Sequence, residues 1–568
     1  MKRVVNLFSI RENMKRLLML AIVGLSMSSA LAQTVYVGPR ANTYEDPANG
    51  IYVSPNGSDN TATGAIDKPY KSINAALAVA QPGATVILCG GTYCEGTDVE
   101  VRVNKPNITI KSKKGEWAHI DLPFPPNPED VNKGQSAIRF DPDASGCKLQ
   151  CVEVTGGWYA VVFNTKWDWG NPNDRTGASN ITIEDCKLHN SRYDVIKIKP
   201  NCDNITIRYN EIYNSGQAVT YKCYPAHPNP GNAEGIDNVN GDNMKVQNNY
   251  IHDICSNAVY AKGGATDVLI ENNRIEHANG GGIFVGFDTG PEYFDLTVNP
   301  QYYENIRGVV RNNLIINTAL SGIALYASKD ALIHNNTLVD VNNGPYHSAI
   351  YFGITYQDWD AGAGRPATVN PNINHNLVNQ PNTYNRPMIE IRYDNNNQLG
   401  ILSALEGNPT MDYNCYYIAG KNATFYDYRP SSLLEAGNLA AWKSHITDDT
   451  HSVELNPNLD ANYMPTNAQC TGMGIEHPLI VAPDPNPHTI HPTLLPETSA
   501  YISNGVLYIE SPIAETVQLY SITGALLFNL QKSEGKASYP MHQLKDSMII
   551  IRGASGWATK LIVQYGCK

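Results

Sequence analysis

The segment NITIRYNEIYN at residues 204–214 contains the pattern that decides the fold. Apolar and polar residues alternate, a polar turn carries an asparagine, and a second short alternating stretch follows. Alternation with a period of two is typical of β-strands. The pattern recurs as NITIEDCKLHN from 180, NMKVQNNYIHD from 243, DVLIENNRIEH from 267, GVVRNNLIIN from 308 and ALIHNNTLVD from 331. Internal repetition of this kind predicts a solenoid.

Each repeat is followed by a third predicted strand, and these strands are residues 194–199, 235–239, 258–262, 282–287, 322–327 and 349–354. The equivalent turn positions are Cys186, Asn210, Asn249, Asn273, Asn313 and Asn336, separated by 24, 39, 24, 40 and 23 residues. Three strands with their turns use about 20–25 residues, so the short steps match one coil of a right-handed parallel β-helix. The long steps indicate insertions at Gln217–Ala233 and Asp288–Asn305. The leucine-rich repeat signature is absent.

Asparagine at the same turn of successive coils can hydrogen-bond along the solenoid axis and satisfy buried backbone groups. We therefore expect the five repeat asparagines to stack. The eleven cysteines do not have the spacing of zinc ligands. We therefore expect Cys186 to be buried and to pack as a small hydrophobic residue. After about Ile354 the repeat is expected to loosen, although residues 389–393 fit one more third strand.

The ends of the chain differ from the repeats. Residues 1–32 are expected to be a signal peptide, with Lys15 and Arg16 before an apolar run and Ala30-Leu31-Ala32 as the cleavage site. A helix within residues 70–80, before a strand at 85–88, is expected to cap the open first coil. The predicted fold class is thus all-β: a right-handed parallel β-helix over residues 33–480 with an N-terminal cap helix.

Residues 481–500 are Pro-rich and are expected to form a linker. Residues 501–568 contain alternating strands such as VLYIE from 506, TVQLYS from 516 and MIIIR from 548, which predict a small β-sandwich. This segment resembles the C-terminal sorting modules of secreted Bacteroidetes proteins, although its last strand ends in Cys567-Lys568. A carbohydrate-contacting accessory domain is the alternative.

The composition limits the classes of partner. The 568 residues include 42 Lys and Arg against 54 Asp and Glu, for a formal net charge of -12. Such a balance argues against a protein that mainly neutralises nucleic acid or an anionic membrane surface. After the signal peptide no segment is apolar and long enough to span a bilayer. We expect an exported protein, either secreted or held at the cell surface or in the periplasm, and a monomer.

The residues around the third strands also predict a cation-binding site. Aligning the apolar residues of these strands places further residues in three rows from coil to coil. The row at the strand entrance contains Asp194, Glu234 and Asn257. The next row points outward and contains Lys197, Asp237 and Tyr260, and the row two residues further on contains Lys199, Val239 and Lys262. Neighbouring coils lie about 4.8 Å apart, so the carboxylates of Asp194, Glu234 and Asp237 can converge on one hard cation such as Ca²⁺. A solvated ladder of charges is the alternative. The insertion that precedes Glu234 favours a binding cleft.

Three stretches carry a resemblance to a known family. They are YVSPNGSD at 52–59, the Pro-Gly and Gly-Thr-Tyr stretch at 82–93, and the coils to about Phe287. They are similar to polysaccharide lyase family nine, which includes pectate and rhamnogalacturonan lyases on a right-handed parallel β-helix. The resemblance implies Ca²⁺ held by aspartates, which here correspond to Asp194 and to the segment 233–237, with Ala233 and Glu234 in place of two aspartates.

The same resemblance implies a lysine as the general base of β-elimination. Lys262 precedes Gly263-Gly264, as the family's base precedes two glycines, although the strand register places the base nearer Tyr260. We therefore predict Lys262 as the base, with Lys199 as the second candidate and with Lys197, Lys199 and Tyr260 as substrate-binding residues. The predicted substrate is an acidic, plant-type polysaccharide containing uronate.

Two other functions fit the residues. A β-helix glycoside hydrolase would use two of the three carboxylates as acid and as base or nucleophile. A non-catalytic glycan-binding solenoid would use aromatic side chains, for which Trp158, Tyr159, Trp167 and Trp169 are candidates, although these residues serve equally well in packing.

Overall fold

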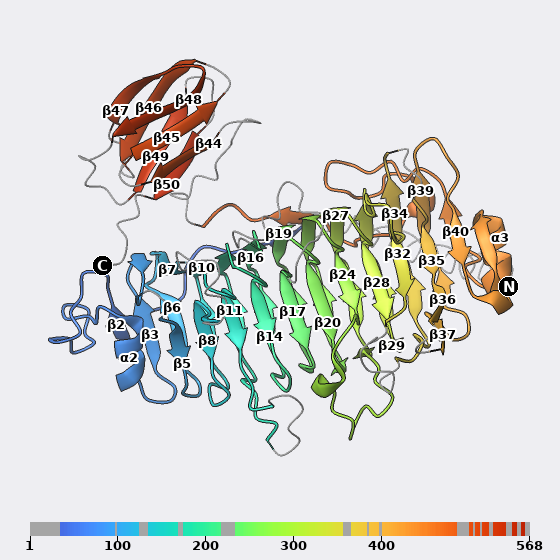
Figure 1. Cartoon of the computed structure of the whole chain (residues 1–568), viewed down its shortest axis with the longest axis horizontal. Helices are drawn as coiled ribbons and strands as arrows, with labels where there is room; N and C mark the ends of the chain where they lie inside the picture. Colours follow the sequence, from blue (N-terminus) through green and yellow to red (C-terminus); the bar gives the residue numbers. More distant parts are fainter. Residues whose placement is uncertain are drawn as a thin grey trace, which may run out of the picture.

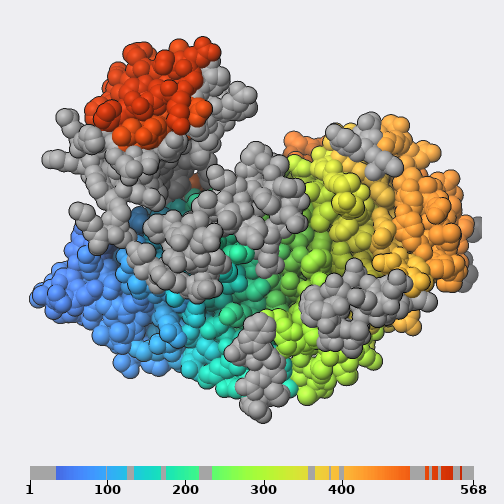
Figure 2. Space-filling model, in the orientation of Figure 1, coloured from blue at the N-terminus to red at the C-terminus, as the bar shows by residue number. Residues whose placement is uncertain are grey.

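The parallel β-helix is the main body of the molecule (Figure 1). The computed structural model describes residues 34–96, 99–123, 134–167, 174–216, 233–355, 365–382, 386–396, 400–485, 499–503, 506–511, 514–521, 526–540, 548–553 and 558–562. The predicted signal peptide at 1–32 lies outside these residues, as do Trp169, most of the insertion at 217–233 and most of the predicted linker at 481–500. In the space-filling view the coils follow one another in sequence order, from blue to orange, along one continuous body (Figure 2).

Three sheets of 12 strands form the coils. Sheet 1 consists of β2 (Ile51–Val53), β3 (Thr85–Leu88), β6 (Thr109–Ser112), β9 (Lys148–Gln150), β12 (Thr182–Glu184), β15 (Thr206–Arg208), β18 (Lys245–Gln247), β22 (Leu269–Glu271), β26 (Val309–Arg311), β30 (Leu332–His334), β33 (Asn372–Asn374) and β38 (Thr410–Asp412). Sheet 2 consists of β4 (Gly91–Tyr93), β7 (Ala118–Leu122), β10 (Val152–Gly156), β13 (Lys187–His189), β16 (Glu211–Tyr213), β19 (Tyr250–Ile254), β23 (Arg274–Ala278), β27 (Leu314–Thr318), β31 (Thr337–Val339), β34 (Leu377–Gln380), β39 (Cys415–Ile418) and β42 (Val453–Glu454). Sheet 3 consists of β5 (Val101–Val103), β8 (Ile138–Phe140), β11 (Val161–Phe163), β14 (Ile196–Ile198), β17 (Ile236–Val239), β20 (Val259–Lys262), β24 (Ile283–Val285), β28 (Ile323–Tyr326), β32 (Ile350–Gly353), β35 (Ile389–Ile391), β40 (Phe425–Asp427) and β41 (Leu434–Gly437). All neighbours pair in parallel except β41, which runs antiparallel to β40.

The register of sheet 3 stacks like residues from coil to coil. Ile196 pairs with Ile236, Ile236 with Val259, and Val259 with Ile283, and all four side chains are fully buried. One position along, Lys197 pairs with Asp237 and Asp237 with Tyr260, as the sequence predicted. Because strand side chains alternate between faces, the core residues fix which residues of this sheet face outward.

The asparagine ladder is confirmed and is longer than the sequence pattern indicated. In each step a side-chain oxygen accepts a hydrogen bond from the backbone N–H of the preceding coil, for example from Asn249 to Asn273 at 3.0 Å. The ladder runs from Cys186 through the five predicted asparagines and continues to Asn376 and Asn414. The residue before each ladder asparagine has a positive φ, so the tight turn leaves backbone groups that only the amide side chains satisfy.

Replacing Asn273 by alanine is expected to lower the free energy of unfolding by about 2–4 kcal/mol, since each buried partner left unpaired costs about 1–3 kcal/mol. Asn273 donates to the carbonyl oxygens of Val246 and Glu271 and accepts from the Asn249 amide. Urea unfolding followed by circular dichroism measures the loss. The exposed Asn60→Ala variant is the control; equal stability of the two variants would contradict the structural role.

The cap helix is confirmed as α2 (Ile73–Val79), which begins at Ser72, whose hydroxyl accepts a hydrogen bond from the Ala75 N–H at 3.3 Å. It buries Ile73, Ala76 and Leu77 against the first coils. At the other end, α3 (Leu439–Ile446) buries Leu439, Trp442 and Ile446. Among the described residues no helix combines the length and the apolar character needed to cross a bilayer.

The expectation that the repeat loosens after Ile354 is wrong. Complete coils continue through β33, β34 and β35 and through β38, β39 and β40, interrupted by the antiparallel pair β36 (Tyr393–Asn396) and β37 (Gly400–Ser403). The remaining short elements are β21 (Ala265–Thr266), β25 (Asn305–Ile306) and β29 (Ser328–Lys329), which form a small parallel sheet, and η2 (Pro291–Tyr293), η4 (Pro430–Ser432) and η5 (Ala468–Cys470). Strand β1 (Val35–Val37) pairs in parallel with β43 (Leu479–Val481), and Val37 lies in one buried cluster with Leu314 of β27 and Val339 of β31.

The C-terminal segment forms two antiparallel sheets, as predicted. One contains β44 (Ser499–Ser503), β45 (Val506–Ser511) and β48 (Gly535–Pro540), and the other contains β46 (Glu515–Ser521), β47 (Leu526–Lys532), β49 (Met548–Gly553) and β50 (Ala558–Ile562). Leu507, Ile509, Val517, Leu519 and Ile551 are fully buried in a core that is separate from that of the β-helix. This arrangement is the predicted β-sandwich; its role in sorting stays a prediction.

Candidate active site

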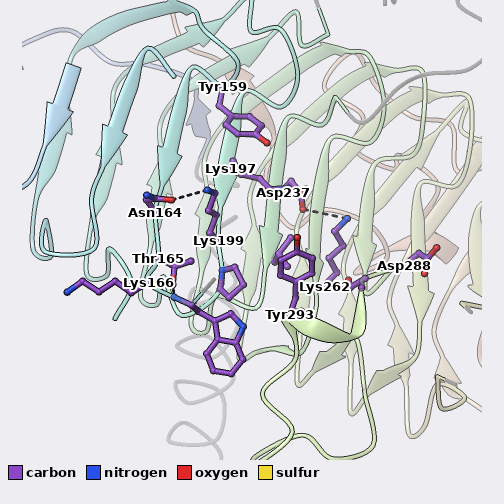
Figure 3. A pocket seen from close by; sticks show the side chains of 15 residues that line it. Tyr159, Asn164, Thr165, Lys166, Lys197, Lys199, Asp237, Lys262, Asp288 and Tyr293 are labelled. Carbon is purple, nitrogen blue, oxygen red and sulfur yellow. Dashed lines mark hydrogen bonds and ion pairs between the residues drawn. The ribbon is translucent and has the colours of Figure 1, made fainter. Parts of the chain in front are cut away.

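A cleft of about 560 Å³ lies on the outer face of sheet 3, over β11, β14, β17 and β20 (Figure 3). The predicted Lys197, Lys199, Asp237 and Lys262 line it. The other lining residues are Tyr159, Asn164, Thr165, Lys166, Trp167, Pro200, Val239, Asp288, Thr289, Gly290 and Tyr293. Asp288, Thr289, Gly290 and Tyr293 belong to the second predicted insertion, so that insertion builds one wall of the cleft.

The carboxylates of Asp194, Glu234 and Asp237 form one cluster, as predicted. One oxygen from each lies within 4.8 Å of the others, and the residues are 0%, 1% and 0% exposed. We call these three residues the carboxylate triad. Asp194 also accepts a hydrogen bond from the Glu234 N–H at 3.0 Å, and Glu234 accepts one from the Ser256 hydroxyl at 3.0 Å. The triad is therefore held by neighbours on three successive coils.

The burial of three carboxyl groups together changes their protonation. Burial raises the pKa of Glu234 well above its usual range, and the adjacent Asp194 raises it further. Burial acts in the same direction on Asp237, but the positive charges of Lys197 and Lys262 outweigh it and lower the pKa of Asp237. Burial thus favours the protonated form of Glu234, whereas the two lysines favour the ionised form of Asp237.

Lys197 lies between two members of the triad. Its Nζ hydrogen-bonds Asp237 and is 3.5 Å from Asp194 Oδ2. Burial alone would lower the pKa of Lys197, but the carboxylates of Asp237 and Asp194 raise it well above its usual value. The side chain was predicted to bind substrate; here it lines the cleft and also acts as a counter-ion of the triad.

Lys262 reaches the triad from the other side, and Figure 3 shows its amine directed at Asp237. The distance from Lys262 Nζ to Asp237 Oδ1 is 3.8 Å, and the lysine side chain is 10% exposed. Its ammonium lies 4.5 Å from the ring centre of Tyr260 and 5.8 Å from that of Phe287. These rings and the carboxylate fix the position of the amine at the edge of the cleft.

The other two predicted substrate residues differ in position. Lys199 lines the cleft and donates to Asn164 Oδ1 at 2.9 Å. Tyr260 is only 3% exposed, stacks on Phe287 at 5.0 Å and receives a hydrogen bond from Asn257. The Tyr260 ring thus packs against the Lys262 amine, and Tyr260 is not among the described residues that line the cleft.

Sequence reasoning missed Asn164, Asp288 and Tyr293. Asn164 directly follows β11, on the coil before the six aligned repeats, so extending the alignment by one coil would have found it. Asp288 and Tyr293 lie in an insertion whose conformation has no repeat to predict it. Of the aromatic candidates, Tyr159 and Trp167 line the cleft, whereas Trp158 stacks on Tyr193 at 4.4 Å.

The triad has the donor set that a hard cation requires. Among the described residues, no hydrogen bond reaches Asp194 Oδ2, Glu234 Oε2 or Asp237 Oδ1, and all three atoms are buried. Buried oxygens without a donor are costly, and Ca²⁺ prefers several carboxylate oxygens in irregular geometry. The residues therefore fit the predicted Ca²⁺, which Asp194, Glu234 and Asp237 would hold.

Comparison with known proteins agrees with this fold. The family model described as a right-handed β-helix region matches residues 150–299 and 234–386. The chain is 33% identical over 123 residues to pectate lyase PEL9 of Emericella nidulans, a match that covers 20% of this chain and 30% of that protein. The chain thus spans about a third of the length of this curated relative. The match confirms, over that segment, the resemblance seen in the sequence.

The chain is also similar, at low sequence identity, to solved structures. The pectate lyase Pel9A structure is 15% identical with a TM-score of 0.40, covering 61% of this chain and 80% of that one. A rhamnogalacturonan lyase structure is 16% identical with a TM-score of 0.43, covering 75% of this chain and 99% of that one. The predicted right-handed parallel β-helix is confirmed by the family model together with the sheets described above.

Proposed function

We propose that this chain is an exported polysaccharide lyase that cleaves an acidic, uronate-containing polysaccharide by Ca²⁺-assisted β-elimination. The observation that supports this most strongly is the buried carboxylate triad, in which each member has an oxygen without a hydrogen bond and of which Asp237 lines a cleft that also contains lysines. A partial match to a protein named pectate lyase supports the same reaction class. Pectate and rhamnogalacturonan are the candidate substrates.

The charges of the cleft suit an acidic polymer. Lys166, Lys199 and Lys262 line it together with Lys197, against the carboxylates of Asp237 and Asp288. Lysine ammonium groups bind carboxylates by charge-assisted hydrogen bonds. Because Lys197 is engaged with the triad, we assign the sugar carboxylates to Lys199 and Lys166, on the side of the cleft opposite Lys262 (Figure 3).

In the proposed reaction Lys262 takes the proton from C5 of a uronate residue. The electrons of the C5–H bond form the C4–C5 double bond, the C4–O4 bond breaks, and the departing oxygen takes a proton from solvent. Ca²⁺ on the triad would offset the charge of the substrate carboxylate, which makes removal of the C5 proton less costly. The amine must be uncharged to accept the proton.

The two alternative functions receive less support. A glycosidase places its two carboxyl groups on either side of the scissile bond, about 5 Å or more apart. The triad oxygens instead converge within 4.8 Å of one another, and the residues are almost fully buried. A purely sugar-binding solenoid gives no reason for a buried triad of this kind.

The direct test is a pair of assays on the purified protein with pectate, rhamnogalacturonan and other acidic polysaccharides. β-Elimination produces an unsaturated uronate that absorbs in the ultraviolet, whereas hydrolysis produces reducing ends without that absorbance. We expect absorbance and reducing ends to rise together on at least one uronate polymer, and to stop when a chelator is added. Reducing ends without absorbance would show a hydrolase, and neither signal on any polymer would contradict a lyase.

A further inference from the structure

A second cleft, of about 590 Å³, adjoins the first on the same face of sheet 3. Asp288 lines both clefts, and in Figure 3 it lies beyond Lys262 on the side away from Lys199. The second cleft follows β24, β28, β32 and β35, which are the next coils along the solenoid (Figure 1). A polymer bound along the axis of the coils would therefore pass from one cleft into the other.

The lining of the second cleft changes from basic to aromatic. Phe284, Phe287, Tyr326, His347 and Tyr351 line it. The His347 and Tyr351 rings are stacked 4.0 Å apart at an interplanar angle of 7°, and Phe287 meets Tyr326 edge to face at 5.2 Å. Burial, and then the charge of Arg392, lower the pKa of His347 to about 4, so this ring is neutral at pH 7. Flat neutral rings of this kind suit the apolar face of a sugar.

Among the described residues that line this aromatic cleft, Arg392 is the one with a permanent positive charge. Arg392 directly follows β35, its side chain is 43% exposed, and its Nη1 lies 3.3 Å from Glu390 Oε1. The guanidinium carries five N–H donors in a planar fork that matches a carboxylate. The two aspartates that line the same cleft already accept hydrogen bonds from other groups. Asp288 accepts one from the Thr355 hydroxyl at 3.2 Å, and Asp394 accepts one from the Asn395 N–H at 2.7 Å.

The register gives the separation of the two basic positions. Phe352 pairs with Ile391, so the residues that follow them, Gly353 and Arg392, occupy equivalent positions on neighbouring coils. Gly353 in turn pairs with Tyr326 on the coil before. Lys262 belongs to β20, which is separated from β35 by β24, β28 and β32. Four steps of about 4.8 Å place the two coils roughly 19 Å apart, a span of several sugar units.

From these observations we propose that the second cleft is a sugar subsite, in which Arg392 binds the carboxylate of a uronate residue several units away from the cleaved bond and the His347 and Tyr351 rings contact the sugars. This inference rests on the proposed function, because it takes the same polymer as its ligand. It adds that the protein prefers long chains over short ones.

The test measures binding apart from cleavage. Isothermal titration calorimetry in a Lys262→Ala background would compare a galacturonate trimer, a galacturonate octamer and a methyl-esterified octamer. We expect the octamer to bind roughly tenfold or more tightly than the trimer, and Arg392→Gln to remove most of that difference. Arg307→Gln is the matched control, because Arg307 is an exposed arginine paired with Asp267 outside both clefts.

Three results would overturn the subsite: equal affinity for trimer and octamer, an octamer affinity that Arg392→Gln leaves intact, or equal affinity for the octamer and its methyl ester. Failure of the lyase proposal is seen separately, as the absence of unsaturated product from the unsubstituted protein. A length dependence that Arg392→Gln abolishes would support the subsite even in that case.

Discussion

Lys262→Arg is expected to lower kcat by about 10²–10⁴-fold, the usual contribution of a positioned general base, with little change in KM. Arginine keeps the positive charge beside Asp237, 3.8 Å from the present amine, but its pKa is too high for it to lose a proton readily. The measurement is the initial rate of unsaturated product formation over a range of substrate concentrations, which separates kcat from KM.

Lys166→Arg is the matched control, because Lys166 lines the same cleft and pairs with the exposed Asp143 at 3.4 Å. We expect this variant to change KM by a small factor and kcat hardly at all. If Lys262→Arg keeps near-normal turnover, Lys262 binds a carboxylate and is not the base. The same substitution at Lys199, whose amine now contacts Asn164, would then be the next experiment.

The fold could be predicted from the sequence wherever one residue type marks the same turn in successive coils. The asparagines gave the period of the coils. The apolar residues of the third strands gave their register, which correctly placed Lys197, Asp237 and Tyr260 in one row. Beyond Ile354 the predicted third strand at 389–393 is confirmed as β35, but the other strands of those coils were missed for a physical reason. Their ladder residues Asn376 and Asn414 follow at long steps of 40 and 38 residues, and the intervening β36–β37 hairpin obscures the period.

The candidate site could be predicted only in part, because strand parity gives the direction of a side chain and not what covers it. Parity places Tyr260 outward, yet Phe287 and Lys262 pack over it. Parity likewise places Lys197 beside Asp237 without revealing that it bridges to Asp194. One wall of the cleft comes from an insertion, where no repeat fixes the backbone, so the repeat pattern could not predict the positions of Asp288 and Tyr293.

Asp237→Ala is expected to weaken Ca²⁺ binding by roughly 100-fold or more, since even residues that only support metal ligands contribute about 10–100-fold to metal affinity. Asp237 supplies one of the three orphaned oxygens and contacts both Lys197 and Lys262. Its removal leaves Lys197 and Lys262 facing two carboxyl groups instead of three, so less negative charge remains to attract a cation. Calorimetric titration with Ca²⁺ measures this loss without reference to activity.

The same variant should lose activity together with Ca²⁺ affinity, and chelation of the unsubstituted protein should have the same effect. Asp143→Ala is the control, because Asp143 is an exposed carboxylate near the cleft that belongs to no cluster of described metal-ligating residues. Asp237→Asn, which keeps the size of the side chain, separates loss of charge from loss of packing, and circular dichroism shows whether either variant folds. Full activity in chelator would remove the metal from the mechanism, and the triad would then act through Lys197, whose ammonium already lies against Asp237 and Asp194.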